Sequence, residues 1–465
     1  MNNGTTIIIF GFTGDLAKRK LIPALYQLFI KQKLNKSWII GCALEKTTVQ
    51  EIVEKAKPFI KEYDQKKLKS FTAIIDYKAI NFKHEKDFQM LEKFVTDKEK
   101  KETHLKSRLA YFATPADFFC IITRLCAESK LFEKINEQDR FHRLVYEKPF
   151  GKGLDSARLI NTCIAEFFDE SQIYRIDHYL TKEVVGNIAM LRFTNCIFEP
   201  LWNKQYIDNI QIILSENVCL EGRGGYYDKF GALCDVVQNH ILELLALVAM
   251  EAPDKLTGEF IREKRAEVLK AVTFEDGILG QYEQYNQELN SNSHSTTETF
   301  AALKLFVNTH RWAGVPFYVK TGKCLDKKET VIHIKFKKVD CLLMKGCPMD
   351  SNYLTIKIDP DAVFSLSLNA KKIDSADEVE PVTMDFCHSC IYGALTPQSY
   401  EIIFQGVINA EHEMSVRFDE IEYAWQVIEK IKSENLSLSF YKGGSSGPQK
   451  ELEDFSFKHG MKWKS

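Results

Sequence analysis

The chain contains 465 residues, of which 45% are hydrophobic and 27% are charged. This length exceeds what one ordinary hydrophobic core organises, and the composition is that of a globular protein, so two domains are expected and global disorder is excluded. The 62 basic and 64 acidic residues give a formal net charge of −2. This balance provides no overall field that would attract nucleic acid, and any affinity for an anion must therefore be local.

Residues 1–10 lack the basic stretch, long apolar run and cleavage site that are typical of a signal peptide, and residues 5–10 predict a strand. No apolar run reaches the roughly 18 residues that a membrane helix needs. Glu243 interrupts the closest candidate, residues 241–250. The twelve cysteines predict reduced thiols in a cytoplasmic protein. Cys387 and Cys390 alone have the spacing of a redox pair or half a metal site; ordinary thiols are the favoured interpretation, and no metal site is predicted.

In chain order, the first third of the sequence alternates strand-like and helix-like segments. Short apolar segments predict strands over 6–10, 37–41, 109–113 and 143–146. Helical spacing or charge predicts helices over 16–29, 49–63, 85–105, 118–128 and 154–168. This alternation is typical of an α/β domain with a Rossmann-like, doubly wound parallel sheet. It stops near Glu170, and we place the dinucleotide-binding domain at residues 1–172.

The remaining sequence has a different pattern. Longer alternating segments predict strands over 207–215, 301–307, 331–337 and 354–358, with helices between them. The polar tract 286–297 predicts a surface loop. We therefore expect residues 173–465 to form an α+β domain with a large, mainly antiparallel sheet.

The segment from Gly11 to Ala17 follows the first predicted strand and opens the first predicted helix. Its glycines permit a tight turn close to a diphosphate, and Ala17 takes the third small-residue position. A purely structural turn remains the alternative. The cofactor-binding residues predicted here are Gly11, Phe12, Thr13, Gly14, Asp15 and Leu16. Asp15 is unusual, because a carboxylate at a helix N-terminus competes with a diphosphate for the positive end of the dipole.

The choice between NAD and NADP is usually made at the end of the second strand. An acid there binds the ribose hydroxyls, whereas an arginine nearby accommodates the 2′-phosphate of NADP. Glu45 is the predicted cofactor-binding residue at this place and favours NAD. Lys46, Lys20 or Arg19 could still hold a phosphate as point charges. Both cofactors therefore remain open.

Residues 175–183 place a carboxylate, an imidazole, a phenol and an ammonium group at short spacing. These groups belong to Asp177, His178, Tyr179 and Lys182. Such a constellation is typical of an anion-binding site, although a strand edge with a surface ion pair is an equally good interpretation of this segment alone.

Several motifs in the same order along the chain resemble those of the glucose-6-phosphate dehydrogenase family. They are the loop 11–17, the Glu-Lys-Pro-Phe-Gly segment 147–151, the cluster 175–183, and the segments 193–203, 221–226, 235–240 and 320–323. The C-terminal segment follows the family more loosely. The resemblance implies oxidation of D-glucose 6-phosphate to 6-phosphogluconolactone with hydride transfer to NADP or NAD, the first step of the pentose phosphate pathway. It also implies a homodimer or homotetramer and a small-molecule sugar phosphate as partner. The charge balance and the lack of a long apolar run predict neither nucleic acid nor membrane as a partner.

The resemblance also implies roles for individual residues. His240 would be the general base, for which a near-neutral pKa is suited. A hydrogen-bonded core histidine is the alternative, because the surrounding segment 231–250 is apolar. Asp177 would orient the base, and Lys148 would be a further catalytic residue that contacts both substrate and cofactor. The implied substrate-binding residues are His178, Tyr179 and Lys182 for the phosphate, Glu216 and Asp235 for the sugar hydroxyls, and Lys323 and Lys328 as further basic contacts.

Two expectations concern geometry. On a regular helix, Asp235 lies about 140° around the axis from His240, so the two would approach one ligand from different sides. Lys148 precedes Pro149, where a cis peptide bond is feasible, and the resemblance implies one.

Two departures from the family pattern bear on the cofactor site. Phe12 and Thr13 replace the usual Ala and Ser, and Leu44 stands where the family commonly has the arginine that holds the 2′-phosphate. The alternative functions are a dehydrogenase of another sugar or hexose phosphate, and a non-catalytic nucleotide-sensing relative.

Overall fold

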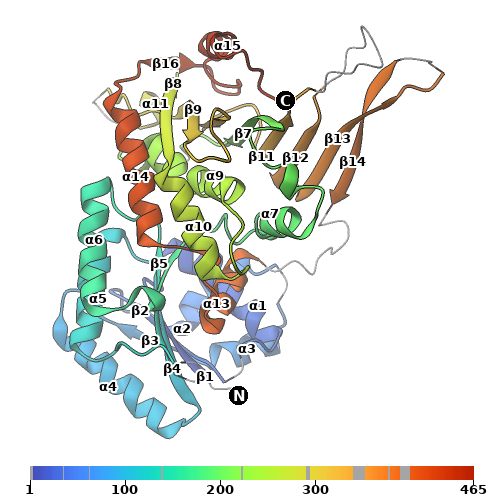
Figure 1. Cartoon of the computed structure of the whole chain (residues 1–465). Coiled ribbons are helices and arrows are strands. Elements are labelled where there is room, and N and C mark those ends of the chain that lie inside the picture. The colour runs from blue at the N-terminus through green and yellow to red at the C-terminus, as the bar shows by residue number, and fades with distance from the viewer. Residues whose placement is uncertain are drawn as a thin grey trace. The chain divides into compact units, whose positions relative to one another are not determined.

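The computed structural model of the chain describes residues 4–34, 36–61, 63–137, 140–220, 222, 224–289, 294–338, 351–374, 378–387 and 398–464. The chain divides into two compact units (Figure 1). Unit 1 comprises Met1–Thr181, Thr257–Arg262 and Pro397–Phe418, and unit 2 comprises Lys182–Leu256, Glu263–Thr396 and Asp419–Ser465. Unit 1 thus includes two segments far beyond residue 172, and the contiguous domains 1–172 and 173–465 stay a prediction.

The centre of unit 1 is a seven-stranded sheet with the order β15-β6-β5-β4-β1-β2-β3. Its strands are β1 (Gly4–Phe10), β2 (Trp38–Ala43), β3 (Ile75–Ala79), β4 (Leu105–Phe112), β5 (His142–Glu147), β6 (Ile173–Ile176) and β15 (Ser415–Val416). The first six run parallel, and β15 joins β6 antiparallel. The order reverses between β1 and β4, where such folds bind dinucleotides at the carboxyl ends of the strands. The predicted Rossmann-like class is confirmed.

Helices cover both faces of the sheet, and the side chains on both faces of β1 are therefore buried. Ile7 and Ile9 pack into one core cluster, and Ile8 and Phe10 pack into another. The helices of this part are a π-helix η1 (Ala17–Leu21), α1 (Ile22–Ile30), α2 (Val49–Ala56), α3 (Gln65–Thr72), α4 (Glu85–Lys101), α5 (Phe119–Glu128) and α6 (Leu154–Phe167). The four predicted strands and five predicted helices are present with shifted ends, whereas α3, β3 and β6 were not predicted.

A segment from the C-terminal part of the chain completes unit 1. Helix α13 (Ser399–Asn409) buries Phe404 in the core on one face of the sheet. Lys31 of α1 forms an ion pair with Glu401 at 2.6 Å. Arg143 of β5 donates to the carbonyl oxygen of Val407 at 2.6 Å. Hydrophobic burial and these polar contacts hold α13 against the Rossmann-like sheet.

Unit 2 is built on a nine-stranded sheet with the order β14-β13-β12-β11-β7-β10-β9-β8-β16. Its strands are β7 (Ile207–Ser215), β8 (Val272–Tyr282), β9 (Phe300–Val307), β10 (Pro316–Gly322), β11 (Glu329–Phe336), β12 (Tyr353–Asp359), β13 (Val363–Lys371), β14 (Val379–Cys387) and β16 (Leu438–Tyr441). Only the pairs β7 with β10 and β8 with β16 are parallel among these described strands. The predicted, mainly antiparallel sheet is confirmed.

The helices of unit 2 include a second π-helix. They are α7 (Glu183–Thr194), α8 (Gly224–Tyr227), the π-helix η6 (Leu233–Ile241), α9 (Leu242–Ala249), α11 (Tyr285–Glu288), α14 (Phe418–Ser433) and α15 (Gln449–Lys458); α10 (Gly258–Lys270) begins in the segment 257–262 of unit 1. None of the helices in the described ranges has the length and the apolar composition that a membrane span requires.

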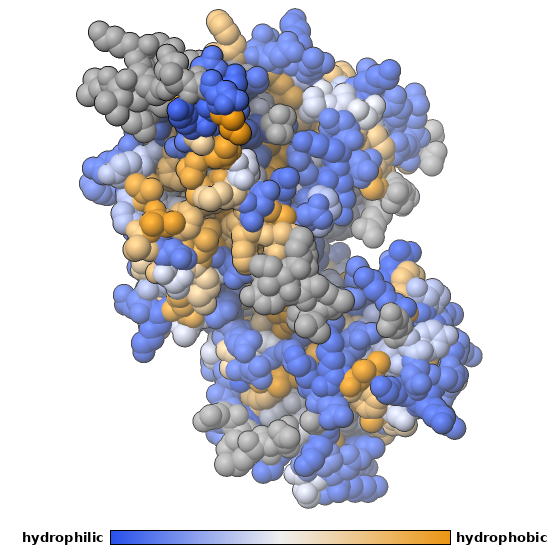
Figure 2. All heavy atoms as spheres, turned by 90° about the vertical axis from the view of Figure 1, so that its right-hand side faces the viewer, coloured by the Kyte–Doolittle hydropathy of each residue, from blue (hydrophilic) through white to orange (hydrophobic). Residues whose placement is uncertain are grey.

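One face of the β13–β14 pair exposes apolar side chains. Val382, Met384 and Phe386 alternate along β14, so they point to the same side of the sheet, and their side chains are between 39% and 56% exposed. Leu366 and Phe364 of β13 lie directly opposite Met384 and Phe386. Figure 2 faces the side of Figure 1 that carries these strands and shows hydrophobic side chains gathered on the surface.

The prediction that all cysteines are reduced thiols is wrong. Disulfides join Cys120 to Cys163, between α5 and α6, and Cys219 to Cys324, with Cα–Cα distances of 5.8 and 4.4 Å. Sequence separations of 43 and 105 residues concealed these pairs, since only the fold makes them neighbours. Cys42, Cys126, Cys196 and Cys234 are free thiols. Cys387 is also disulfide-bonded, and Cys390 lies outside the described residues.

Candidate functional site

The glycine loop lies at the carboxyl end of β1, next to the point where the strand order reverses. Gly11 has a φ of +89°, and a Cβ atom there would lie 2.3 Å from the carbonyl oxygen of Ala113. The Gly14 N–H donates to the Gly11 carbonyl oxygen at 2.9 Å. Only glycine fits such a turn at position 11. The resulting backbone is open to the close approach of a diphosphate and fits a dinucleotide.

Phe12 is accommodated by a glycine on the neighbouring strand. The side chain of Phe12 is fully buried, and a Cβ atom on Gly41 of β2 would lie 2.0 Å from its ring. The bulky residue therefore occupies space that Gly41 leaves empty. Because the ring belongs to the core, Phe12 can offer a ligand only its backbone.

Asp15 pairs with Arg19 one turn later, at the start of the π-helix η1. The Arg19 Nε donates to Asp15 Oδ1 at 2.8 Å, and both side chains are more than half exposed. The pair offsets the negative charge that would compete with a diphosphate. Leu16 packs against the core cluster.

The second strand ends with an anchored carboxylate. Glu45 accepts a hydrogen bond from the Thr13 hydroxyl, so the glycine loop and the end of β2 are directly joined. The hydroxyl of Tyr77, which sequence reasoning missed, donates to the backbone carbonyl of Glu45. Leu44 is 67% exposed. This edge of unit 1 therefore presents an acid and an exposed apolar side chain.

The last residue of β5, Glu147, is a carboxylate that two hydroxyls contact, and a cis peptide bond follows it. The Lys148–Pro149 bond is cis, as the resemblance implied. Glu147 accepts hydrogen bonds from the hydroxyls of Tyr111 and Tyr400. Burial raises the pKa of Glu147 to about 6, although these hydrogen bonds and Lys148 oppose the shift. The sequence places Glu147 in a motif but does not predict its contact with Tyr400, because Tyr400 comes from α13, far along the chain.

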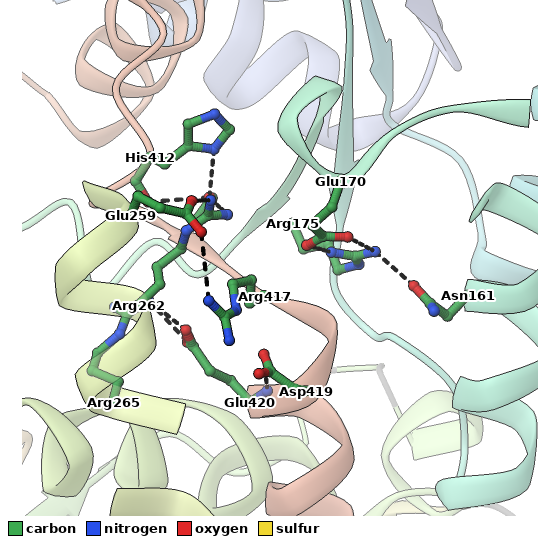
Figure 3. A network of polar contacts seen from close by, with 11 residues as sticks. Asn161, Glu170, Arg175, Glu259, Arg262, Arg265, His412, Arg417, Asp419 and Glu420 are labelled. Carbon is green, nitrogen blue, oxygen red and sulfur yellow. Dashed lines mark hydrogen bonds and ion pairs between the residues drawn. The ribbon is translucent and has the colours of Figure 1, made fainter. Parts of the chain in front are cut away.

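The cluster 175–183 forms a turn between β6 and α7. Arg175 is buried and donates to Glu170 at 2.6 Å and to Asn161 at 2.7 Å, so its role is structural (Figure 3). Asp177 is buried, and its Oδ1 accepts the Tyr179 backbone N–H at 2.8 Å. The ring of His178 lies 4.9 Å from that of Tyr179. The alternative of a strand edge is excluded for the four predicted residues, because β6 ends at Ile176.

Unit 2 brings Lys182, a predicted phosphate-binding residue, and Lys328, a predicted further basic contact, to one carboxylate. Lys182 and Lys328 lie 4.0 and 2.9 Å from the two oxygens of Asp359 at the end of β12. Burial lowers the pKa of Lys182, Asp359 opposes this, and Lys328 adds to it. Sequence reasoning missed Asp359, since an acid at a strand end has no local signal.

Glu216 and Lys323 are also brought together. They follow β7 and β10, which are parallel neighbours with Ser215 opposite Gly322. The carboxyl ends of parallel strands meet at one edge, and there Lys323 forms an ion pair with Glu216. The Lys323 ammonium lies 5.0 Å from the centre of the Tyr227 ring.

The expected angle between Asp235 and His240 is wrong. Both lie in the π-helix η6, where each turn closes with i→i+5 hydrogen bonds, so residues five apart lie approximately one above the other. The side chain of His240 is buried, and the backbone N–H of His240 donates to Asn239 Oδ1 at 2.7 Å. The pairing of His240 with Asp177 stays a prediction, because the two residues belong to different units.

Family models, curated relatives and a solved structure all match the chain to the same family. The family described as "Glucose-6-phosphate dehydrogenase, NAD binding domain" matches residues 8–187, and its "C-terminal domain" matches 189–464. The glucose-6-phosphate 1-dehydrogenase of Bacillus subtilis is 37% identical over 98% of this chain and 97% of its own length. That of Chlamydia pneumoniae is 35% identical over 98% and 95%. A solved glucose-6-phosphate dehydrogenase in complex with its substrate glucose 6-phosphate covers 100% of this chain and 99% of its own, with 31% identity and a TM-score of 0.92.

Proposed function

Because the chain belongs to the glucose-6-phosphate dehydrogenase family, we propose that it oxidises D-glucose 6-phosphate to 6-phospho-D-glucono-1,5-lactone, the first step of the pentose phosphate pathway. The observation that carries the proposal is the match, over nearly the whole chain, to a relative whose structure contains this sugar phosphate. The match includes both sheets, and therefore the cofactor part as well as the substrate part.

The proposed reaction needs a base and a hydride acceptor. His240 takes the proton of the anomeric hydroxyl, while C1 loses hydride and becomes the lactone carbonyl carbon. A bound nicotinamide dinucleotide supplies the acceptor for that hydride. Asp177 orients His240 and stabilises its protonated form, and the Tyr179 N–H in turn holds Asp177. Lys148 contacts the substrate and the cofactor.

The substrate phosphate is bound by His178, Tyr179, Lys182 and Lys328. A phosphate dianion attracts both ammonium groups more strongly than the single charge of Asp359 does. Asp359 therefore serves as a counter-ion until the substrate arrives. Glu216, Asp235 and Lys323 bind the sugar hydroxyls, for which the Glu216–Lys323 pair offers both acceptors and donors.

We also propose that NAD is the preferred acceptor. The Thr13 hydroxyl anchors Glu45, whose carboxylate suits the two ribose hydroxyls of NAD and repels the 2′-phosphate of NADP. Leu44 offers no compensating charge. Asp15 engages Arg19, a nearby guanidinium.

A homodimer formed through the β13–β14 face is the proposed assembly of this enzyme. The exposed apolar stripe of Val382, Met384 and Phe386 supports it, since contiguous exposed apolar patches typically mark interaction surfaces. Light scattering should give about twice the mass of one chain, and Met384→Lys should favour the monomer.

Initial rates with glucose 6-phosphate and each of NAD and NADP test the function. We expect turnover with glucose 6-phosphate, a far higher KM for unphosphorylated glucose, and a higher kcat/KM with NAD. The absence of any turnover with glucose 6-phosphate and either cofactor would contradict the proposed reaction.

A further inference from the structure

A carboxylate from a distant part of the chain accepts a hydrogen bond from the start of the π-helix that carries Asp235 and His240. Glu298, just before β9, accepts the backbone N–H of Leu233 with its Oε1 at 3.0 Å. Its backbone carbonyl accepts the N–H of Ala232 at 2.9 Å. The first N–H groups of a helix have no partner within the helix, and Glu298 satisfies two that lie at this start.

Gly231 makes this contact possible. It has a φ of +65°, and a Cβ atom there would lie 2.4 Å from the Glu298 carboxylate oxygen. A negative charge is also favourable at this end of the helix dipole. Burial raises the pKa of Glu298, whereas its hydrogen bond with the Leu233 N–H and the charge of Lys432 oppose the shift.

The next residue, Thr299, holds the second part of the substrate region. Its carbonyl oxygen accepts the N–H of Lys323 at 2.9 Å. Its hydroxyl lies 2.8 Å from that of Tyr441, which donates to the Lys323 carbonyl at 2.7 Å. Two consecutive residues therefore join the helix of Asp235 and His240 to the loop of Lys323.

We infer that Glu298 is a positioning residue, which fixes the start of η6 and thereby the directions of Asp235 and His240. The role rests on the proposed function, in which these two residues act on the sugar. Glu298 acts only through the helix. A π-helix has one more residue per hydrogen-bonded turn than an α-helix, so relaxation of its start turns the later side chains away from their directions.

Two variants separate the hydrogen bond from the charge. Glu298→Ala removes the acceptor, and we expect kcat to fall about tenfold and KM for glucose 6-phosphate to rise severalfold, as lost hydrogen bonds at a site do. Glu298→Gln keeps an acceptor oxygen and should recover most of both parameters. KM for the cofactor should stay within about twofold in each variant, because the cofactor loop belongs to unit 1.

The matched control is Glu288→Ala. Glu288 also accepts a backbone N–H, that of Leu220 at 3.2 Å, but it does not lie on η6 or on the Lys323 loop. Kinetics of Glu298→Ala equal to those of this control would overturn the inference. So would a Glu298→Gln variant as impaired as Glu298→Ala.

Hydrogen exchange measured by mass spectrometry gives a readout that is independent of activity. Peptides covering 232–241 should exchange faster in Glu298→Ala than in the wild type, and not in Glu298→Gln or Glu288→Ala. Gly231→Ala, which displaces the carboxylate without removing it, should have the same effect as Glu298→Ala. If the exchange of these peptides is unchanged in both Glu298→Ala and Gly231→Ala, the inference is overturned. A wild type inactive on glucose 6-phosphate would refute the proposed function, and exchange would still decide the role of Glu298 at the helix start.

Discussion

Leu44→Arg combined with Glu45→Gln should convert a preference for NAD into one for NADP. Leu44 is 67% exposed, so its replacement removes no core packing and should change stability by less than about 0.5 kcal/mol. The amide oxygen of glutamine still accepts the hydrogen bond of the Thr13 hydroxyl, so the end of β2 keeps its anchor.

Two separate effects determine how far the preference should shift from NAD toward NADP. A solvent-exposed guanidinium that binds a phosphate contributes about 1–2 kcal/mol, which is roughly 5- to 30-fold in affinity. At about 5 Å in water, a carboxylate repels a phosphate dianion by about 1.7 kcal/mol, and physiological salt reduces this to about 1 kcal/mol, or roughly fivefold. In Leu44→Arg alone, Glu45 partly neutralises the new guanidinium, so the double variant should exceed the single one.

The assay compares kcat/KM for NADP and NAD at saturating glucose 6-phosphate. We expect the ratio to rise about 5-fold or more in Leu44→Arg and about 25-fold or more in the double variant. Leu44→Gln, which adds no charge, is the control and should leave the ratio unchanged. A ratio that moves less than about threefold in the double variant would refute the reasoning from this edge of the sheet.

Four further outcomes test other parts of the structure. Lys182→Ala should raise KM for glucose 6-phosphate at least about tenfold and leave KM for glucose unchanged in initial-rate assays, because it loses a contact to the phosphate. His240→Asn should lower kcat by orders of magnitude with a nearly unchanged substrate Kd, since it removes the proposed base. His142 and His333 have pKa values lowered to about 3 by burial. Because unfolding raises these values to about 6.5, the free energy of unfolding should fall by about 1.4 kcal/mol for each histidine between pH 7.5 and 5.5, measured by urea titration. Cys219→Ser opens the longer disulfide loop and should lower the free energy of unfolding of the oxidised protein by about 2–4 kcal/mol, with no difference from the wild type in excess dithiothreitol.

The fold was largely predictable because hydrophobic patterns report burial. β1 is apolar at every position from Ile7 to Phe10 and lies between two cores, which is the expected pattern of a central parallel strand. β3 was missed because Asp76, Tyr77 and Lys78 interrupt its apolar pattern at the edge of the sheet. No local pattern reports that α13 returns to the first sheet, since only its packing places it there.

The site was predictable where one segment carries the chemistry and less so where distant segments share it. Asp177 to Lys182 follow one another in the sequence, and their types alone suggested an anion site. Asp359 and Glu298 have no such signal, because each acts on a partner more than 60 residues away. Long-range partners of this kind require the fold.

In the two π-helices of the described residues, the hydrophobic periodicity of the sequence predicts the directions of the side chains poorly. η1 follows the glycine loop, and η6 carries Asp235 and His240. An α-helical pattern fits both sequences, since the apolar positions of a short segment accommodate either period. On an α-helix, Asp235 and His240 would approach a ligand from different sides, whereas the π-helix turns them toward the same side. The first N–H groups of the helix have no partner within it, and the Glu298 carboxylate accepts that of Leu233. A single acid outside the helix thus stabilises the geometry that the proposed base needs.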